Sequence, residues 1–132
     1  MIELAPVGHV ESTLTDAATA PKQGAEGSPE ATVVIAAEYA PALADVQAGT
    51  DIVLLTWLDR ARRDVLAVHP RDDPARPLTG VFATRSQDRP NPIGLHRVHV
   101  VAVDGLRLRV RDLEALDGPP VLDVKLALPG ER

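Results

Sequence analysis

The stretch from Gly80 to Leu95, GVFATRSQDRPNPIGL, concentrates hydrogen-bond donors in sixteen residues. Two guanidinium groups, Arg85 and Arg89, stand four residues apart, and Thr84 and Ser86 add hydroxyls beside the first of them. Guanidinium forks and hydroxyls together are suited to binding a carboxylate, a ribose or a phosphate. The spacing therefore predicts an anion-binding or nucleotide-binding loop.

Two prolines stiffen this loop. Pro90 holds Arg89 in extended conformations, and Pro92 does the same to Asn91. Because a stiff loop loses little entropy on binding, its donors are already arranged for a ligand. The same pattern also fits a plain turn between two strands, with the arginines paired to Asp88 and its neighbours.

A second cluster, RDLEALDGPPVLDVKLALPG from Arg111 to Gly130, places acidic side chains and a lysine around an Asp-Gly-Pro turn. These charged residues are Asp112, Glu114, Asp117, Asp123 and Lys125. Backbone groups bared by Gly118 and Pro119 could hold a purine or an ammonium group. A turn simply capped by Asp117 explains the pattern equally well.

Several other chemistries are disfavoured. The sequence has no cysteine, which excludes a thiolate nucleophile, a disulfide and a cysteine zinc site. His96 and His99 are three apart and point to opposite faces of a strand, so we expect no metal site there. Ser86 has no recognisable histidine and aspartate partners, and there is no GxGxxG or phosphate-binding P-loop motif.

Apolar alternation predicts that short strands carry these loops. The expected strands are 2–12, 31–37, 51–58, 64–69, 80–84, 94–103 and 106–112. Asp104 and Gly105 indicate a hairpin turn, after which Leu106, Leu108 and Val110 should face the core and Arg107, Arg109 and Arg111 the solvent. Spacing at Leu43 and Val46, with Gly49 after it, predicts one helix over 39–49.

The length of 132 residues suits one domain, residues 1–132, with a single core. Only 2% of residues are aromatic, so small aliphatic side chains must fill that core. The elements predict a mainly β domain with one or two short helices. Either a closed barrel, which removes exposed sheet edges, or a sandwich fits this count.

Charge is distributed unevenly along a chain whose net charge is -5. Residues 60–111 hold eleven arginines against five acids, a local net charge of +6. This predicts a localised anion-binding face rather than general adhesion to nucleic acid. With no apolar run long enough to cross a membrane and no signal peptide pattern, we expect a soluble cytoplasmic protein without a membrane partner.

Two of these segments, GVFATRSQDRPNPIGLHRVHV and DLEALDGPPVLDVK, resemble the paired signature of the TsaA/TrmO-type tRNA methyltransferases. Upstream, APKQGAEG and WLDR are also similar to family segments. The resemblance implies a small β-barrel that binds S-adenosylmethionine at a homodimer interface. It further implies methylation of N6 of threonylcarbamoyl-adenosine beside the anticodon of tRNA.

The resemblance also assigns residue roles by position. The implied cofactor contacts are Pro21, Lys22, Gln23, Leu58, Asp59, Arg85, Leu95, Leu116, Asp117, Gly118 and Pro119. For catalysis, we expect Arg89 to anchor an anion of cofactor or nucleotide, Asn91 to orient the acceptor, and Lys125 to contact RNA phosphate or the threonyl carboxylate. No metal is expected.

This sequence departs from the family pattern at three places, Gln87, Pro119 and Leu126. Two alternatives therefore stay open beside the methyltransferase. One is a non-catalytic module that binds S-adenosylmethionine or a nucleotide. The other is a cofactor-free RNA-binding barrel in which Arg107, Arg109 and Arg111 form a phosphate-binding stripe.

Overall fold

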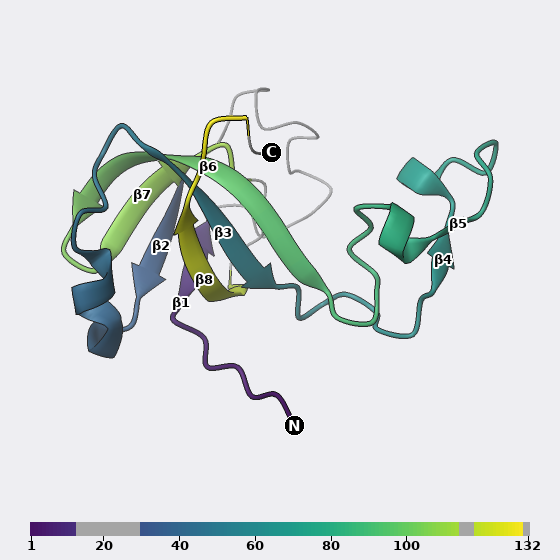
Figure 1. Ribbon diagram of the computed structural model, residues 1–132, viewed down its shortest axis with the longest axis horizontal. Coiled ribbons are helices and arrows are strands. Elements are labelled where there is room, and N and C mark those ends of the chain that lie inside the picture. The colour runs from purple at the N-terminus through teal and green to yellow at the C-terminus, as the bar shows by residue number, and fades with distance from the viewer. Residues whose placement is uncertain (13–29, 114–117, 131–132) are drawn as a thin grey trace.

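Six antiparallel strands close into a barrel in the order β1-β2-β7-β6-β3-β8, with β8 returning to β1 (Figure 1). The computed structural model describes residues 1–12, 30–113 and 118–130. The barrel strands are β1 (Gly8–Ser12), β2 (Ala31–Ile35), β3 (Asp51–Trp57), β6 (Ile93–Asp104), β7 (Arg107–Arg111) and β8 (Pro120–Leu126). The mainly β fold is confirmed, and between barrel and sandwich the structure is a barrel.

Small aliphatic side chains fill the barrel, as the scarcity of aromatic residues requires. Fully buried members of this core include Val10, Val33, Leu54, Val100, Leu108, Val110 and Val121. In β7 the two core residues alternate with three exposed arginines, which confirms the predicted period of two. The hairpin between β6 and β7 is also confirmed, with Gly105 at a φ of 57°, in the left-handed region that glycine tolerates.

The two ends of the barrel differ. At the end called here the loop end, β1, β3 and β7 finish while β2, β6 and β8 begin. Trp57 of β3 lies opposite Ile93 of β6 there, and residues 58–92 run out between them. At the opposite end, η1, a 3-10 helix over Ala37–Leu43, follows β2 and packs through Tyr39 and Leu43 against the core.

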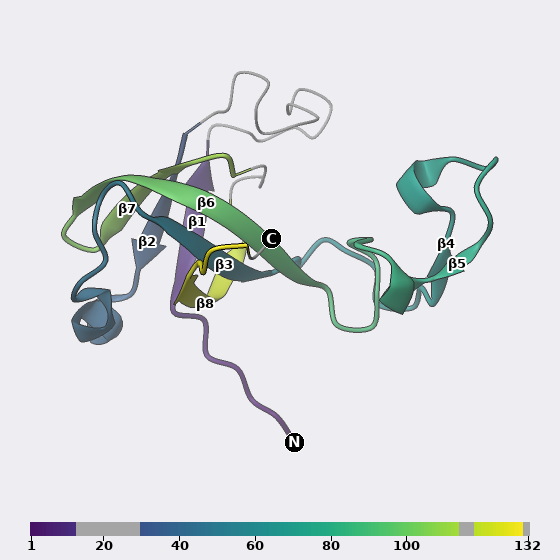
Figure 2. The ribbon, with the colours of Figure 1, turned by 45° about the horizontal axis from the view of Figure 1, so that its top comes forward.

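Residues 58–92 form a lobe that projects from the barrel (Figures 1 and 2). It holds a small two-stranded sheet of β4 (Ala67–Val68) and β5 (Thr79–Gly80), and the 3-10 helices η2 (Pro70–Asp72) and η3 (Val81–Ala83). The strands expected over 64–69 and 80–84 are therefore wrong in extent. After Gly80 the chain turns into η3 because Arg89, described below, draws the carbonyls of this segment inward.

Three further expectations need correction. The helix expected over 39–49 is the shorter η1: Pro41 has no N–H to donate, and Asp45 at a φ of 70° turns the chain out of helical geometry. The strand expected over 2–12 begins only at Gly8. β8 was not predicted, because its charged residues Asp123 and Lys125 looked like part of a turn cluster.

Candidate functional site

Arg89 holds the arginine turn together from inside. Its guanidinium donates to the carbonyl oxygens of Thr84 (3.1 and 3.3 Å) and Ser86 (3.2 Å), and also to that of Val81. A guanidinium group has five N–H donors in a fixed fork, so a turn of converging carbonyls matches it well. In this structure Arg89 shapes the loop, whereas the sequence suggested that it anchors a ligand anion.

A second arginine, Arg63, was missed by the sequence analysis and braces the loop from the other side. Its Nε donates to the Pro90 carbonyl at 2.7 Å, and its terminal nitrogen donates to Asn91 Oδ1 at 2.9 Å. The guanidinium carbon also lies 5.1 Å from the ring centroid of Trp57, within cation–π range. Asn91, the predicted acceptor-orienting residue, is therefore linked to the loop end of the barrel.

Backbone contacts complete this bracing. The Arg62 N–H donates to Asp88 Oδ1 at 2.8 Å, and the Arg89 N–H donates to the Arg62 carbonyl at 3.0 Å. Asp88 thus accepts from a backbone amide, not from the arginine side chains that a plain turn would pair with it. Arg85 is exposed and has no hydrogen bond or ion pair with any residue in the described ranges. It is available to an anionic ligand.

Leu58 and Gly94 lie where the lobe joins the barrel. The Leu58 N–H donates to the Pro92 carbonyl at 2.8 Å, so Leu58 sits beside the proline-rich segment. Gly94 faces the barrel interior, where a Cβ would come within 3.2 Å of the Leu58 side chain. Leu95 points to the outer surface and is 43% exposed, and Asp59 is exposed in the first turn of the lobe.

The later glycine bend lies at the same loop end, beside β1. The Gly118 N–H donates to the Val10 carbonyl at 2.8 Å, and the Val10 N–H donates to the Pro119 carbonyl at 3.0 Å. Pro119, which has no N–H, is buried, while Gly118 is exposed at a φ of 107°. The missing Pro119 donor therefore leaves these two backbone hydrogen bonds with β1 intact. Pro21, Lys22, Gln23, Leu116 and Asp117 lie outside the described residues.

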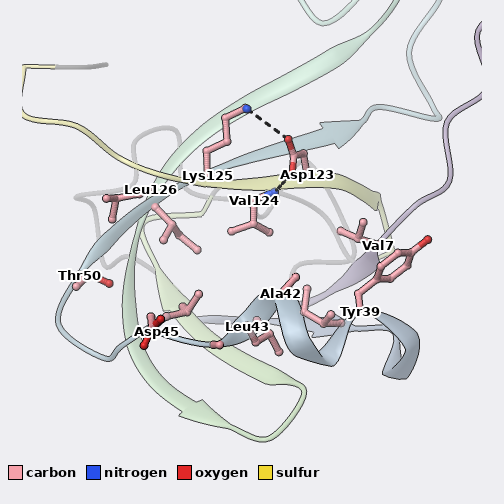
Figure 3. A pocket seen from close by; sticks show the side chains of 14 residues that line it. Val7, Tyr39, Ala42, Leu43, Asp45, Thr50, Asp123, Val124, Lys125 and Leu126 are labelled. Carbon is pink, nitrogen blue, oxygen red and sulfur yellow. Dashed lines mark hydrogen bonds and ion pairs between the residues drawn. The ribbon is translucent and has the colours of Figure 1, made fainter.

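Lys125 does not join the other candidate residues. It lies opposite Val53 in β8, and its Nζ is 3.6 Å from Asp123 Oδ2. It borders a cavity of about 360 Å³ between β8 and η1, towards the end of the barrel opposite the loops (Figure 3). In Figure 3 the Lys125 ammonium turns away from the hollow and towards Asp123. Its catalytic role stays a prediction that this geometry does not favour.

The histidines face opposite sides of β6, as predicted. His96 is inside, where its Nε2 lies 2.9 Å from Thr56 Oγ1, and burial lowers its pKa. His99 is outside, with Nδ1 2.8 Å from Asp51 Oδ1; this hydrogen bond is the main reason that the Asp51 pKa is lowered. In the ranges 1–12, 30–113 and 118–130, no three His, Asp or Glu side chains gather to hold a metal ion.

The exposed arginines of β7 are each paired with an acid. Arg107 contacts Glu11 at 2.6 Å, Arg109 contacts Glu30 at 3.1 Å, and Arg111 has the weaker Asp112 contact at 3.9 Å. Neutralised in this way, the stripe has little positive charge left for phosphates. Of the helices in the described ranges, none has the length and apolar character needed to span a lipid bilayer.

Sequence comparison places this geometry among known proteins. The family described as "tRNA-methyltransferase O N-terminal domain" matches residues 9–129, which span the barrel, the lobe and the glycine bend. The chain belongs to this family. The resemblance deduced from the two motifs is therefore confirmed.

Two of its curated relatives come from Archaeoglobus fulgidus. A "Probable S-adenosyl-L-methionine-binding protein" is 42% identical over 95% of this chain, and this chain spans only 34% of that relative's length. An "S-adenosyl-L-methionine-binding protein" is 43% identical over 92% of this chain and 86% of its own length. The crystal structure of TrmO from Pseudomonas aeruginosa has a TM-score of 0.78 and 27% identity over 98% of this chain and 57% of that one.

Proposed function

We propose that this chain is an S-adenosylmethionine-dependent methyltransferase, and that its substrate is threonylcarbamoyl-adenosine in tRNA, methylated at N6. The observation that carries the proposal is the family match over residues 9–129, which includes both sequence motifs. The names of the relatives support the cofactor, and the family supports the methyl transfer and the tRNA. The exact nucleoside rests on the resemblance alone.

The described residues fit the cofactor. Arg85, exposed and without a partner in the described part of the chain, suits the methionine carboxylate through a charge-assisted hydrogen bond. The exposed backbone at Gly118, where an added Cβ would meet nothing within 4 Å, lets an adenine ring approach closely. Leu58 at the base of the lobe and Leu95 beside it on β6 offer apolar surface. The remaining contacts assigned by resemblance stay predictions.

When bound, S-adenosylmethionine supplies a sulfonium methyl group that an acceptor nitrogen takes in line: an N–C bond forms, the C–S electron pair leaves on a neutral thioether, and the nitrogen's proton passes to water. The chain's own residues mainly orient the reactants. Asn91, fixed by Arg63, presents its amide to the acceptor, and Arg89 keeps the turn in shape. An acyl group on N6 makes that N–H more acidic, so no strong base is required.

A second copy of the chain would complete the site. The lobe stands clear of its own barrel (Figure 2), and no hydrogen bond in the described chain joins the arginine turn to Gly118 or Pro119. The lobe exposes Leu66, Leu78 and Phe82, with Phe82 87% exposed. We infer a homodimer in which this apolar surface packs against the partner and the two motifs meet across the interface.

The competing candidate is a non-catalytic module that binds S-adenosylmethionine. It is favoured by the names of the curated relatives, which state binding and not catalysis. The departures at Gln87, Pro119 and Leu126 are compatible with it. The cofactor-free RNA-binding barrel is less favoured because the β7 arginines that it requires are already paired with acids.

Titration calorimetry with S-adenosylmethionine tests the cofactor. We expect saturable binding by the wild type and binding about tenfold weaker or worse for Arg85→Ala, since hydrogen bonds to charged groups contribute about 1.5–3 kcal/mol. Arg71→Ala, an exposed arginine of η2, is the matched control and should bind like the wild type. Absence of binding at millimolar ligand would contradict both cofactor-dependent candidates.

A further inference from the structure

Arg63 contacts three parts of the molecule that are distant in sequence. It lies over the indole of Trp57, where β3 ends, and donates to the Pro90 carbonyl and to Asn91 Oδ1. The contacts to Pro90 and Asn91 span 27 and 28 residues along the chain. Arg63 thereby fixes the proline-rich end of the arginine turn to the rim of the barrel.

The chemistry of this contact decides which way the Asn91 amide faces. A guanidinium group only donates hydrogen bonds, so the atom of Asn91 that faces it must be the oxygen. The amide nitrogen, with its two N–H donors, then points away from Arg63. Asn91 is exposed, and no acceptor for these donors is found within the described ranges.

We propose that Arg63 is a positioning residue that turns the Asn91 amide so that its N–H donors face the methyl acceptor. This inference rests on the proposed function and adds a specificity to it. With Asn91 Oδ1 occupied, the loop offers donors only: the amide N–H groups of Asn91 and the guanidinium of Arg85. The acceptor molecule must therefore present an oxygen beside the reacting nitrogen, as a carbonyl or carboxylate does.

Lysine could not take this role. The two donated bonds come from the fork of one planar group, and the same plane lies over the Trp57 ring. A lysine ammonium is a point charge that cannot make this bidentate contact and stack at once. Arg63→Lys should therefore behave like Arg63→Met, although it keeps the charge.

Methyl-transfer kinetics with tRNA in a double-mutant cycle test the proposal. Asn91→Ala and Arg63→Met should each lower kcat about 100-fold, because a small misplacement of an orienting group has an effect of that order. The double variant should be no more than about threefold slower than Asn91→Ala, since Arg63 acts through Asn91. The Kd for S-adenosylmethionine should stay within about twofold of wild type in all three.

Asn91→Asp separates positioning from substrate contact. Aspartate keeps an oxygen for Arg63 but has no N–H donors, so the brace should survive while kcat falls as far as in Asn91→Ala. The fluorescence of Trp57, the single tryptophan of the chain, should stay as in the wild type for Asn91→Asp and change for Arg63→Met. Arg71→Met is the matched control and should change neither quantity.

The outcomes distinguish this inference from the proposed function. A wild type that transfers no methyl group would overturn the proposed function and, with it, the catalytic part of this role. An active wild type whose Arg63→Met variant keeps its kcat, or whose two losses multiply, would overturn the positioning role alone. The brace has its own readout in the side-chain amide resonances of Asn91: if these do not shift in Arg63→Met, Arg63 does not hold the amide.

Discussion

The hydroxyl of Thr56 lies 2.9 Å from Nε2 of His96, inside the loop end of the barrel and against the backbone of Gly94. Thr56 is fully buried, so this hydrogen bond satisfies a polar group that would otherwise be costly to bury. It also ties β3 to β6 at the point where both strands lead into the lobe. The geometry of the site therefore depends on a pair of residues that need not touch any ligand.

Burial of His96 makes the stability of the fold depend on pH. Because burial lowers its pKa, the unfolded chain takes up a proton near pH 6.5 while the folded chain remains neutral to a lower pH. The free energy of unfolding should thus be independent of His96 above about pH 7 and fall as the pH drops below about 6.5. Urea denaturation of wild type and His96→Gln at pH 7.5, 6.5 and 5.5, which are choices of about one-unit spacing, should show a shallower decline in the variant. Equal declines would contradict this reading.

Gly94 leaves the space in which the Thr56–His96 pair fits. A Cβ at this position would lie 2.6 Å from His96 Nε2 and closer still to Thr56 Oγ1. Gly94→Ala should therefore destabilise the protein by about 1–3 kcal/mol through overpacking, measured by urea denaturation. Gly80→Ala is the matched control, since its nearest neighbour would be 4.0 Å away, and should be almost neutral. A neutral Gly94→Ala would show that the barrel mouth is loosely packed.

The strands that are visible in the sequence are those with a regular alternation and a clear turn. Leu106 to Asp112 alternates core and arginine residues behind an Asp-Gly turn, and it forms β7 as expected. β8 escaped prediction because its exposed charges lie in a segment rich in glycine and proline, and because its pairing with β3 is interrupted by an irregularity between Leu55 and Thr56. Period-two patterns do not survive such interruptions.

The site was predicted in composition but not in its internal contacts. The motif marked the arginine turn correctly, yet its spacing could not show that Arg89 bonds to carbonyls of its own loop while Arg85 stays open. Arg63 was invisible because its partner Asn91 is 28 residues away, and nothing in the local sequence of Arg63 indicates a brace. Contacts of this length depend on the fold and not on local pattern.

The paired arginines of β7 should contribute little to RNA binding. Replacing Arg107, Arg109 and Arg111 together by glutamine should leave the dependence of tRNA affinity on salt nearly unchanged, because each side chain is paired with an acid. If the three bound phosphates of a duplex region, the slope of log K against log salt would fall by about 0.9 for each phosphate that the variant no longer neutralises. Filter binding between 50 and 200 mM salt, a range of about fourfold, separates these results.

The apolar surface of the lobe should hold the homodimer together. Phe82→Ser removes the most exposed side chain of that surface and should weaken dimerisation about tenfold or more in sedimentation equilibrium, since a buried phenylalanine contributes about 1.5–3 kcal/mol. Leu4→Ser, at an exposed leucine outside the lobe, is the control and should leave the dimer intact. A wild-type monomer, or a Phe82→Ser dimer of unchanged affinity, would exclude the lobe as the interface.

Methyl transfer to tRNA decides the central claim. The protein is incubated with tRNA containing threonylcarbamoyl-adenosine and with S-adenosylmethionine labelled in its methyl group, and the nucleosides are then released and weighed by mass spectrometry. We expect one labelled methyl group on that nucleoside, and almost none when Asn91→Ala replaces the wild type. Wild-type protein that binds S-adenosylmethionine in calorimetry but labels no nucleoside would contradict the enzyme and leave the non-catalytic binding module in its place.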